Sequence, residues 1–396
     1  MSEPEVLQET PDFSLVLGGP LFQLFRRAHL SGDALELMLR RILAISLFAW
    51  LPLLLLSLLG GHALGGGIRI PFLSDIEMHI RFLIALPVLI AAELIVHRRI
   101  RPVVQQFAAR RIIIAEQIPQ FHTAINSAMR IRNSALVELL LLVVVYTAGH
   151  WLWRNGLALE QASWYARPDG TGLNLTYAGY WLAFVSVPLF QLILLRWYVR
   201  LFTWFWLLWR VSKLNLRLTP THPDRAGGLG FLGDSAHAFA PILFAQGALL
   251  AGLIASRIFY DGQVLMTFKE EAALFVVVFV LFILGPLTVF SGQLARAKRM
   301  GLREYGILAS RYVQGFDEKW VKGGAPGTEE LLGSGDIQSL ADLGNSIAIV
   351  REMRPVPFRM DAVVMLVAAT VAPLLPLTLT VISPQELFLK LIKILL

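Results

Sequence analysis

Residues 272–293 read AALFVVVFVLFILGPLTVFSGQ, a run that contains no charged side chain. A helix needs about 20 apolar residues to cross the ~30 Å hydrocarbon core of a bilayer. The run does not alternate between apolar and polar residues, as a transmembrane strand would. It therefore predicts a membrane-spanning α-helix, and the rest of the chain repeats the same pattern.

Six further apolar runs are long enough to cross a bilayer; they lie near residues 42–60, 82–97, 135–153, 177–200, 236–257 and 362–383. Of the 396 residues, 56% are apolar, which exceeds the roughly 45–50% of soluble domains. We predict an all-α polytopic membrane protein with about seven transmembrane helices. The fourth run continues to Trp209, so helix four can instead extend over about 182–209. Prolines inside the runs predict kinked helices.

The basic residues predict the orientation of the chain. Of the 35 Lys and Arg residues, 27 lie in the segments 1–41, 98–134, 196–235 and 294–361. Because Lys and Arg are enriched on the cytoplasmic side, we expect these segments and the N-terminus there, and the C-terminus outside. The net charge of +7 then reflects topology, and no nucleic-acid partner is expected.

The expected organisation follows from the spans. It consists of a cytoplasmic segment (1–41), helices one to six (42–293) with cytoplasmic loops (98–134 and 201–235), a cytoplasmic helical segment (294–361), and helix seven with an interfacial tail (362–396).

Two cytoplasmic segments have amphipathic patterns. The Arg-rich segment 98–134 predicts a helix against the lipid headgroups, broken near Pro119, which either connects two spans or recognises anionic lipids. Farther along, Asp336 can cap a helix whose apolar residues recur every three or four positions. Those residues are Ile337, Leu340, Leu343, Ile347 and Val350. This face must pack on another cytoplasmic element or on a neighbouring subunit.

Four ionisable residues fall at a similar depth near the cytoplasmic ends of helices two, three and four; they are Glu93, Glu138, Arg196 and Arg200. Each costs about 2.5–3.5 kcal/mol inside the membrane, so each needs a partner or a function. One interpretation is a pair of salt bridges that join the three helices. The other is an anion pathway in which the arginines line a vestibule and a glutamate tunes or gates it.

The loop before helix five reads THPDRAGGLGFLG over residues 221–233. Its candidate functional residues are His222, Asp224, Arg225, Gly227 and Gly228. The loop matches neither the phosphate-loop nor the dinucleotide-binding pattern. It is either a capped turn, in which Asp224 pairs with Arg225 or caps backbone amides, or a functional site. In the second case it serves as a ligand site, a gate or an acid–base pair of His222 and Asp224.

At this loop the chain resembles an uncharacterised family of bacterial polytopic inner-membrane proteins with a His-Pro-Asp-x-x-Gly-Gly-Leu-Gly-Phe-Leu loop. A second stretch that carries the resemblance runs from Asp336 to Leu343 and on through Met353–Phe358. The resemblance covers most of the chain from helix two onward. It implies a bacterial inner (plasma) membrane location and no particular activity.

We predict a channel or transporter, for an ion or small anion, that forms a homo-oligomer surrounded by membrane lipids. The alternatives are a membrane enzyme acting on a lipid-like substrate, and a membrane scaffold or sensor that recruits a partner through its 336–353 helix. The chain has no cysteine, and the outer-side histidines His62 and His150 have no second pair at ligand spacing; Asp234 and His237 could complete a metal site with the His222 loop, which is the less favoured interpretation. We therefore predict no catalytic residue, no cofactor and no metal site.

Overall fold

The computed structural model describes residues 13–20, 22–23, 37–65, 67–152, 163–169, 172–324, 330–331 and 333–380. Within these ranges the chain is helical apart from its connections, two isolated bridges and one antiparallel hairpin of β1 (Ala166–Asp169) and β2 (Gly172–Leu175). The predicted all-α class is confirmed.

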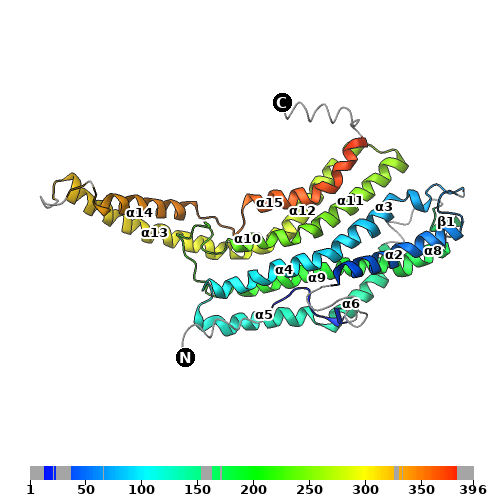
Figure 1. The fold of residues 1–396 in the computed structure, drawn as a ribbon, viewed down its shortest axis with the longest axis horizontal. Helices are drawn as coiled ribbons and strands as arrows, with labels where there is room; N and C mark the ends of the chain where they lie inside the picture. Colours follow the sequence, from blue (N-terminus) through cyan, green and yellow to red (C-terminus); the bar gives the residue numbers. More distant parts are fainter. Residues whose placement is uncertain are drawn as a thin grey trace.

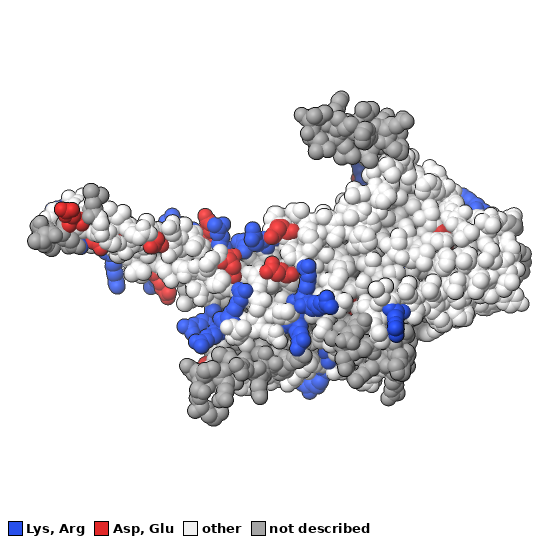
Figure 2. Space-filling view, in the orientation of Figure 1, with Lys and Arg blue, Asp and Glu red and all other residues white. Residues whose placement is uncertain are grey.

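Seven helices of the described chain are long and apolar enough to cross a membrane, as predicted. They are Met38–Leu59, Ile76–Ala109, Ala135–Leu152, Tyr177–Val211, Phe231–Asp261, Leu265–Val321 and Met360–Thr380. Helix four has the longer of its two predicted forms. Figure 2 shows a broad face with few charged side chains, and beside it a region around the hairpin described below where they gather. This distribution is typical of a protein embedded in lipid.

Most spans consist of more than one helical piece. The pieces are α2 (Met38–Leu59); α3 (Ile76–His79) and α4 (Leu86–Ala109); α6 (Ala135–Val144) and α7 (His150–Leu152); α8 (Tyr177–Trp181) and α9 (Val187–Val211); α10 (Phe231–Ala236) and α11 (Ala240–Asp261); α12 (Lys269–Leu284) and α13 (Ser291–Phe316); and α15 (Met360–Val371). Within the described ranges, α5 (Ile118–Arg132) and α14 (Gly335–Glu352) lie outside these spans.

Irregular turns interrupt the spans next to prolines. A π-helical turn precedes Pro87 and another precedes Pro188, while Pro286 lies in a 3₁₀ turn. Proline lacks a backbone N–H and its ring clashes with the carbonyl one turn earlier, which disturbs the regular α-helical pattern at these three positions, whereas α2 and α4 continue through Pro52 and Pro102. These turns are the departures from regular helix that the interior prolines predict.

The long helices run along the long axis of the molecule (Figure 1). The span that contains α11 is the most buried, with 67% of its apolar window inside the protein, whereas the α6 span has 6%. At the centre, α11 packs tightly on α15, because a Cβ atom on Gly247 would overlap the carbonyl oxygen of Thr370. Small residues allow this close approach of two backbones in a membrane.

Helix α13 continues the sixth span and forms a projecting hairpin with α14 (Figure 1). The apolar face of α14 therefore packs on another element of the same chain, although only Val350 is fully buried. The prediction that Asp336 caps this helix is wrong. Ser334 occupies the cap position, and the carboxylate of Asp336 instead accepts hydrogen bonds from Lys319 Nζ (2.9 Å) and Trp320 Nε1 (2.8 Å).

The 98–134 segment is also divided differently from the prediction. Helix α4 continues to Ala109, and α5 begins at Ile118. The break thus precedes Pro119, which lies in the first turn of α5, where a missing N–H costs nothing. The expected interfacial tail lies outside the described residues, which end at 380.

Candidate functional site

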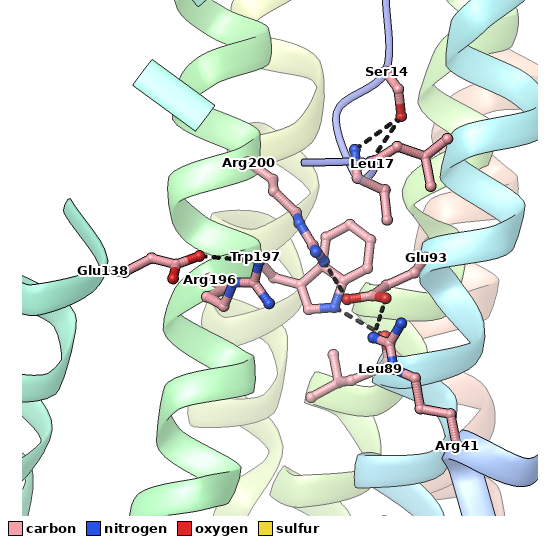
Figure 3. Close-up of polar contacts among 10 residues, drawn as sticks. Ser14, Leu17, Arg41, Leu89, Glu93, Glu138, Arg196, Trp197 and Arg200 are labelled. Atoms are coloured by element: carbon pink, nitrogen blue, oxygen red, sulfur yellow. Dashed lines mark hydrogen bonds and ion pairs between the residues drawn. The ribbon is translucent and has the colours of Figure 1, made fainter. Parts of the chain in front are cut away.

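Figure 3 shows the charged residues that helices α2, α4, α6 and α9 bring together. Arg200 Nη1 lies 2.8 Å from Glu93 Oε1. The other carboxylate oxygen of Glu93 accepts a hydrogen bond from Arg41. Arg196 Nη2 lies 3.3 Å from Glu138 Oε1, which links α9 to α6. The four residues singled out in the sequence thus form two ion-paired groups, and Glu93 pairs with two arginines at once.

The Glu93 group is almost completely removed from solvent. The side chains of Arg41, Glu93 and Arg200 are 3%, 5% and 7% exposed. Trp197 packs against Arg200, whose guanidinium lies 4.7 Å from the centre of the indole ring. The indole Nε1 in turn donates to the carbonyl oxygen of Leu89 (2.9 Å). The position of Arg200 on α9 is therefore held by Trp197 of the same helix and by Glu93 of α4.

Arg41 was missed because the first span was predicted to start after it. In the structure α2 begins at Met38, so Arg41 lies inside the helix. It is followed by Ile45, Ala49 and Leu53, which are all buried. Residues four apart lie on the same face of a helix. That spacing was a signal that Arg41 faces the protein interior.

The N-terminal segment, residues 13–19, covers the charged residues on one side. Phe13, Leu15 and Val16 are at most 2% exposed. Ser14 Oγ lies 2.9 Å from His97 Nδ1 of α4, which fixes the segment to the bundle (Figure 3 shows Ser14). The sequence analysis treated this stretch only as part of a cytoplasmic segment. The apolar run that follows Asp12 was the available signal for its burial.

Arg132, the last residue of α5, adds a fourth arginine. Its guanidinium donates to the carbonyl oxygen of Ser14. Burial and the nearby Arg200 guanidinium lower the pKa of Arg132 to about 10, so the side chain remains charged near pH 7. Sequence analysis counted Arg132 only among the basic residues of the 98–134 segment.

We call these six residues the charged cluster: Arg41, Glu93, Arg132, Glu138, Arg196 and Arg200. With all side chains ionised, the cluster has four positive and two negative charges. A small, partly open space of about 20 Å³ lies against it, between the N-terminal segment and helices α5, α6 and α9. Three of the arginines, Arg132, Arg196 and Arg200, line this space together with Glu138.

The His222 loop is organised around one carboxylate. Asp224 accepts hydrogen bonds from the backbone N–H groups of Ala226 (2.8 Å), Gly228 (3.1 Å) and Gly230 (2.8 Å). Burial raises the pKa of Asp224, but these three bonds and the nearby His222 outweigh it and hold the pKa below its ordinary value. Asp224 therefore occupies the anion-binding concavity that the glycine-rich backbone forms.

The remaining candidates of this loop have separate roles. His222 Nδ1 lies 2.9 Å from Asp224 Oδ1, and the His222 side chain is 37% exposed. Arg225 does not pair with Asp224; its guanidinium lies 3.0 Å from Glu352 Oε2, and both side chains are more than half exposed. Gly227 has a φ of 63° and Gly228 a φ of 98°, values that favour glycine.

The two stretches that carry the family resemblance contact each other. Arg354 donates from its backbone N to the carbonyl oxygen of Arg225 (2.8 Å) and from Nη2 to that of Asp224 (2.7 Å). Met353 is buried, and a Cβ atom on Gly227 would lie 3.0 Å from its Cε. The His222 loop and the segment that contains Met353 and Arg354 thus form one interface.

Comparison of the chain with protein-family models, with curated proteins and with solved structures finds no match. Fold and site therefore define the class of this protein directly. It is a polytopic helical membrane protein with seven candidate spans and a buried, positively charged cluster where α2, α4, α6 and α9 meet.

Proposed function

We propose that this chain is a channel or transporter for a small anion, with the charged cluster as the site that selects it. The observation that carries the proposal is that four arginines and two glutamates of the described residues gather in one cluster, with side chains that are mostly buried. An intramembrane cluster with surplus charge is typical of an ion pathway.

The size of this space supports a small ion. A water molecule needs roughly 10–15 Å³ of such space, and about 20 Å³ lies beside the cluster. A dehydrated monatomic anion such as chloride fits this volume, whereas a phosphorylated metabolite does not. Leu15, Val16 and Gly18 of the N-terminal segment line one side of the space, so we infer that this segment controls access to it.

The membrane and orientation belong to the same proposal. The excess of Lys and Arg around the charged end of the bundle supports a cytoplasmic location for that end and for the N-terminus. The family resemblance supports the bacterial inner membrane. The cluster then lies within the membrane part of the pathway, toward its cytoplasmic side.

Ion flux through purified protein in liposomes tests the function. We expect the full chain, or a variant that lacks residues 1–19, to pass chloride in preference to potassium. The chloride flux of the variant Arg196→Gln/Arg200→Gln should be at least tenfold lower than that of the unmodified chain. Arg225→Gln, which removes an arginine from an exposed ion pair, should keep it.

Two outcomes would reject the proposal. One is that neither the full chain nor the shortened variant passes anions although both are folded. The other is that the double variant keeps the chloride preference of the unmodified chain.

A second candidate function, a scaffold or sensor, is favoured by the α13–α14 hairpin. It projects from the bundle (Figure 1) and exposes apolar side chains such as Ile307, Leu308 and Val313, each 48–50% exposed. A soluble protein that co-purifies in equal amount, and is lost when Ile307 and Val313 are changed to serine, would support this function. A homo-oligomer without such a protein would count against it.

A further inference from the structure

A groove of about 260 Å³ lies between α5 and the C-terminal end of α9, away from the charged cluster. Gln120 and Thr123 of α5 form one wall. Trp209, Arg210 and Lys213 form the other. An anion in this groove would meet two cations, an indole ring and an amide group.

The two cations of the groove have no carboxylate partner. In the described part of the chain no ion pair joins Arg210 or Lys213 to an acidic side chain. Each lies instead near an indole ring: the Arg210 guanidinium is 5.8 Å from the centre of Trp206, and Lys213 Nζ is 5.4 Å from that of Trp209. Arg210 lies in the last turn of α9 and Lys213 in the turn that follows it, and both line the same groove.

The groove also lies at the boundary of the membrane. Arg210 and Lys213 stand at the end of the Tyr177–Val211 span. Trp209 is 42% exposed, and Phe202, seven residues earlier on the same face, is 54% exposed. Tryptophan prefers the level of the lipid headgroups, and an exposed phenylalanine next to it belongs among acyl chains. Apolar surface therefore leads directly to the two cations.

We propose that this groove binds the phosphodiester headgroup of an anionic membrane lipid. Arg210 presents a planar guanidinium that can hold two phosphate oxygens, and Lys213 adds a point charge. Gln120 offers its amide N–H groups from the opposite wall. The acyl chains then lie along Phe202. The continuity of cations with exposed apolar surface favours a lipid over a free phosphate ion.

The site has a structural consequence. Trp206, whose indole ring lies near the Arg210 guanidinium, donates a hydrogen bond from Nε1 to Ser127 Oγ of α5 (3.2 Å). A lipid between the two walls therefore bridges α5 and α9, the helices that supply Arg132, Arg196 and Arg200. Lipid binding should stabilise the packing of these helices.

Thermal unfolding of the full chain in detergent micelles tests the proposal. Phosphatidylglycerol should raise the unfolding midpoint in a saturable manner, because a ligand of the folded state stabilises it by mass action, and phosphatidylcholine should not. Arg210→Gln/Lys213→Gln should weaken the apparent phosphatidylglycerol affinity at least tenfold. Arg98→Gln/Arg99→Gln removes the same charge from exposed positions of α4 and should leave the affinity unchanged.

A second variant separates shape from charge. Thr123→Trp fills the groove while every charge is kept, and it should weaken phosphatidylglycerol binding as the double variant does. The proposal is overturned if both groove variants fold and keep the affinity of the unmodified chain. It is also overturned if the Arg98/Arg99 control loses affinity equally, which would mean nonspecific charge attraction. Inorganic phosphate could also raise the unfolding midpoint as much as phosphatidylglycerol does, in a way that requires Arg210 and Lys213. That result would make the groove a site for soluble anions and would reject the lipid as its ligand.

Discussion

Replacement of Glu93 by glutamine is the sharpest test of the charged cluster. The substitution keeps the shape of the side chain and removes one negative charge. Arg41 and Arg200 each lose an ion-pair partner, and both are nearly inaccessible to water. We expect Glu93→Gln to lower the free energy of unfolding strongly.

The magnitude follows from distance and burial together. At 2.8 Å the Arg200–Glu93 attraction is about 6 kcal/mol for an effective dielectric constant of ~20, before desolvation is subtracted. Removal of one partner from a buried pair costs about 3–5 kcal/mol, because an uncompensated charge remains inside. The Arg225–Glu352 pair, at 3.0 Å, has similar geometry but is more than half exposed. Exposed pairs contribute about 0–1 kcal/mol.

The assay is reversible unfolding in micelles, with Glu352→Gln as the control of matched geometry. Glu93→Gln should cost about 3–5 kcal/mol and Glu352→Gln less than about 1 kcal/mol. Adding Arg200→Met to Glu93→Gln should recover part of the loss, since it removes one of the buried positive charges that Glu93 faces. Equal, small losses for Glu93→Gln and Glu352→Gln would refute the reasoning, because Glu93 would then not be an ionised partner of two buried arginines.

Three further results are expected. The pKa of Asp224 is lower in the folded chain than the unfolded value of about 3.9, so its ionised carboxylate stabilises the fold at pH values above about 3.9. This stabilisation is lost as the pH falls through the folded pKa. Asp224→Asn should abolish this pH dependence of the unfolding free energy. Gly247→Ala should destabilise the bundle in thermal melts, because its Cβ overlaps backbone, whereas Gly252→Ala has 3.4 Å of clearance and should be tolerated. Because the chain has no cysteine, a single cysteine can be introduced and labelled. Thr203 lines the space beside the cluster and is 1% exposed, so Thr203→Cys should react with a small thiol reagent only after residues 1–19 are removed. Equal reaction with those residues present would show that the N-terminal segment does not cover this position.

The fold was predictable because its strongest signal is local. Crossing the bilayer requires about 20 apolar residues, and each run could be counted without knowing its neighbours. The helix ends were less predictable. Arg41 was assigned to the segment before helix one, and helix four had two possible ends, because a charged residue one turn from a helix end can lie on either side of the boundary.

The charged residues at membrane depth were found for the same reason, since a helix rises 1.5 Å per residue and depth follows from position. Their pairing was not determined. Which arginine meets Glu93 depends on the rotation of each helix about its axis and on which helices are adjacent, and neither is a property of one span.

By itself, the sequence determined that this chain is a bundle of about seven membrane-spanning helices with four ionisable residues at one depth, because length and depth are set within each segment. Only the tertiary structure decided that Arg41 and Arg132 join those residues, that the N-terminal segment covers them, and that Arg354 holds the loop of Asp224. These contacts join residues far apart in the chain, so their existence depends on how the helices pack against one another.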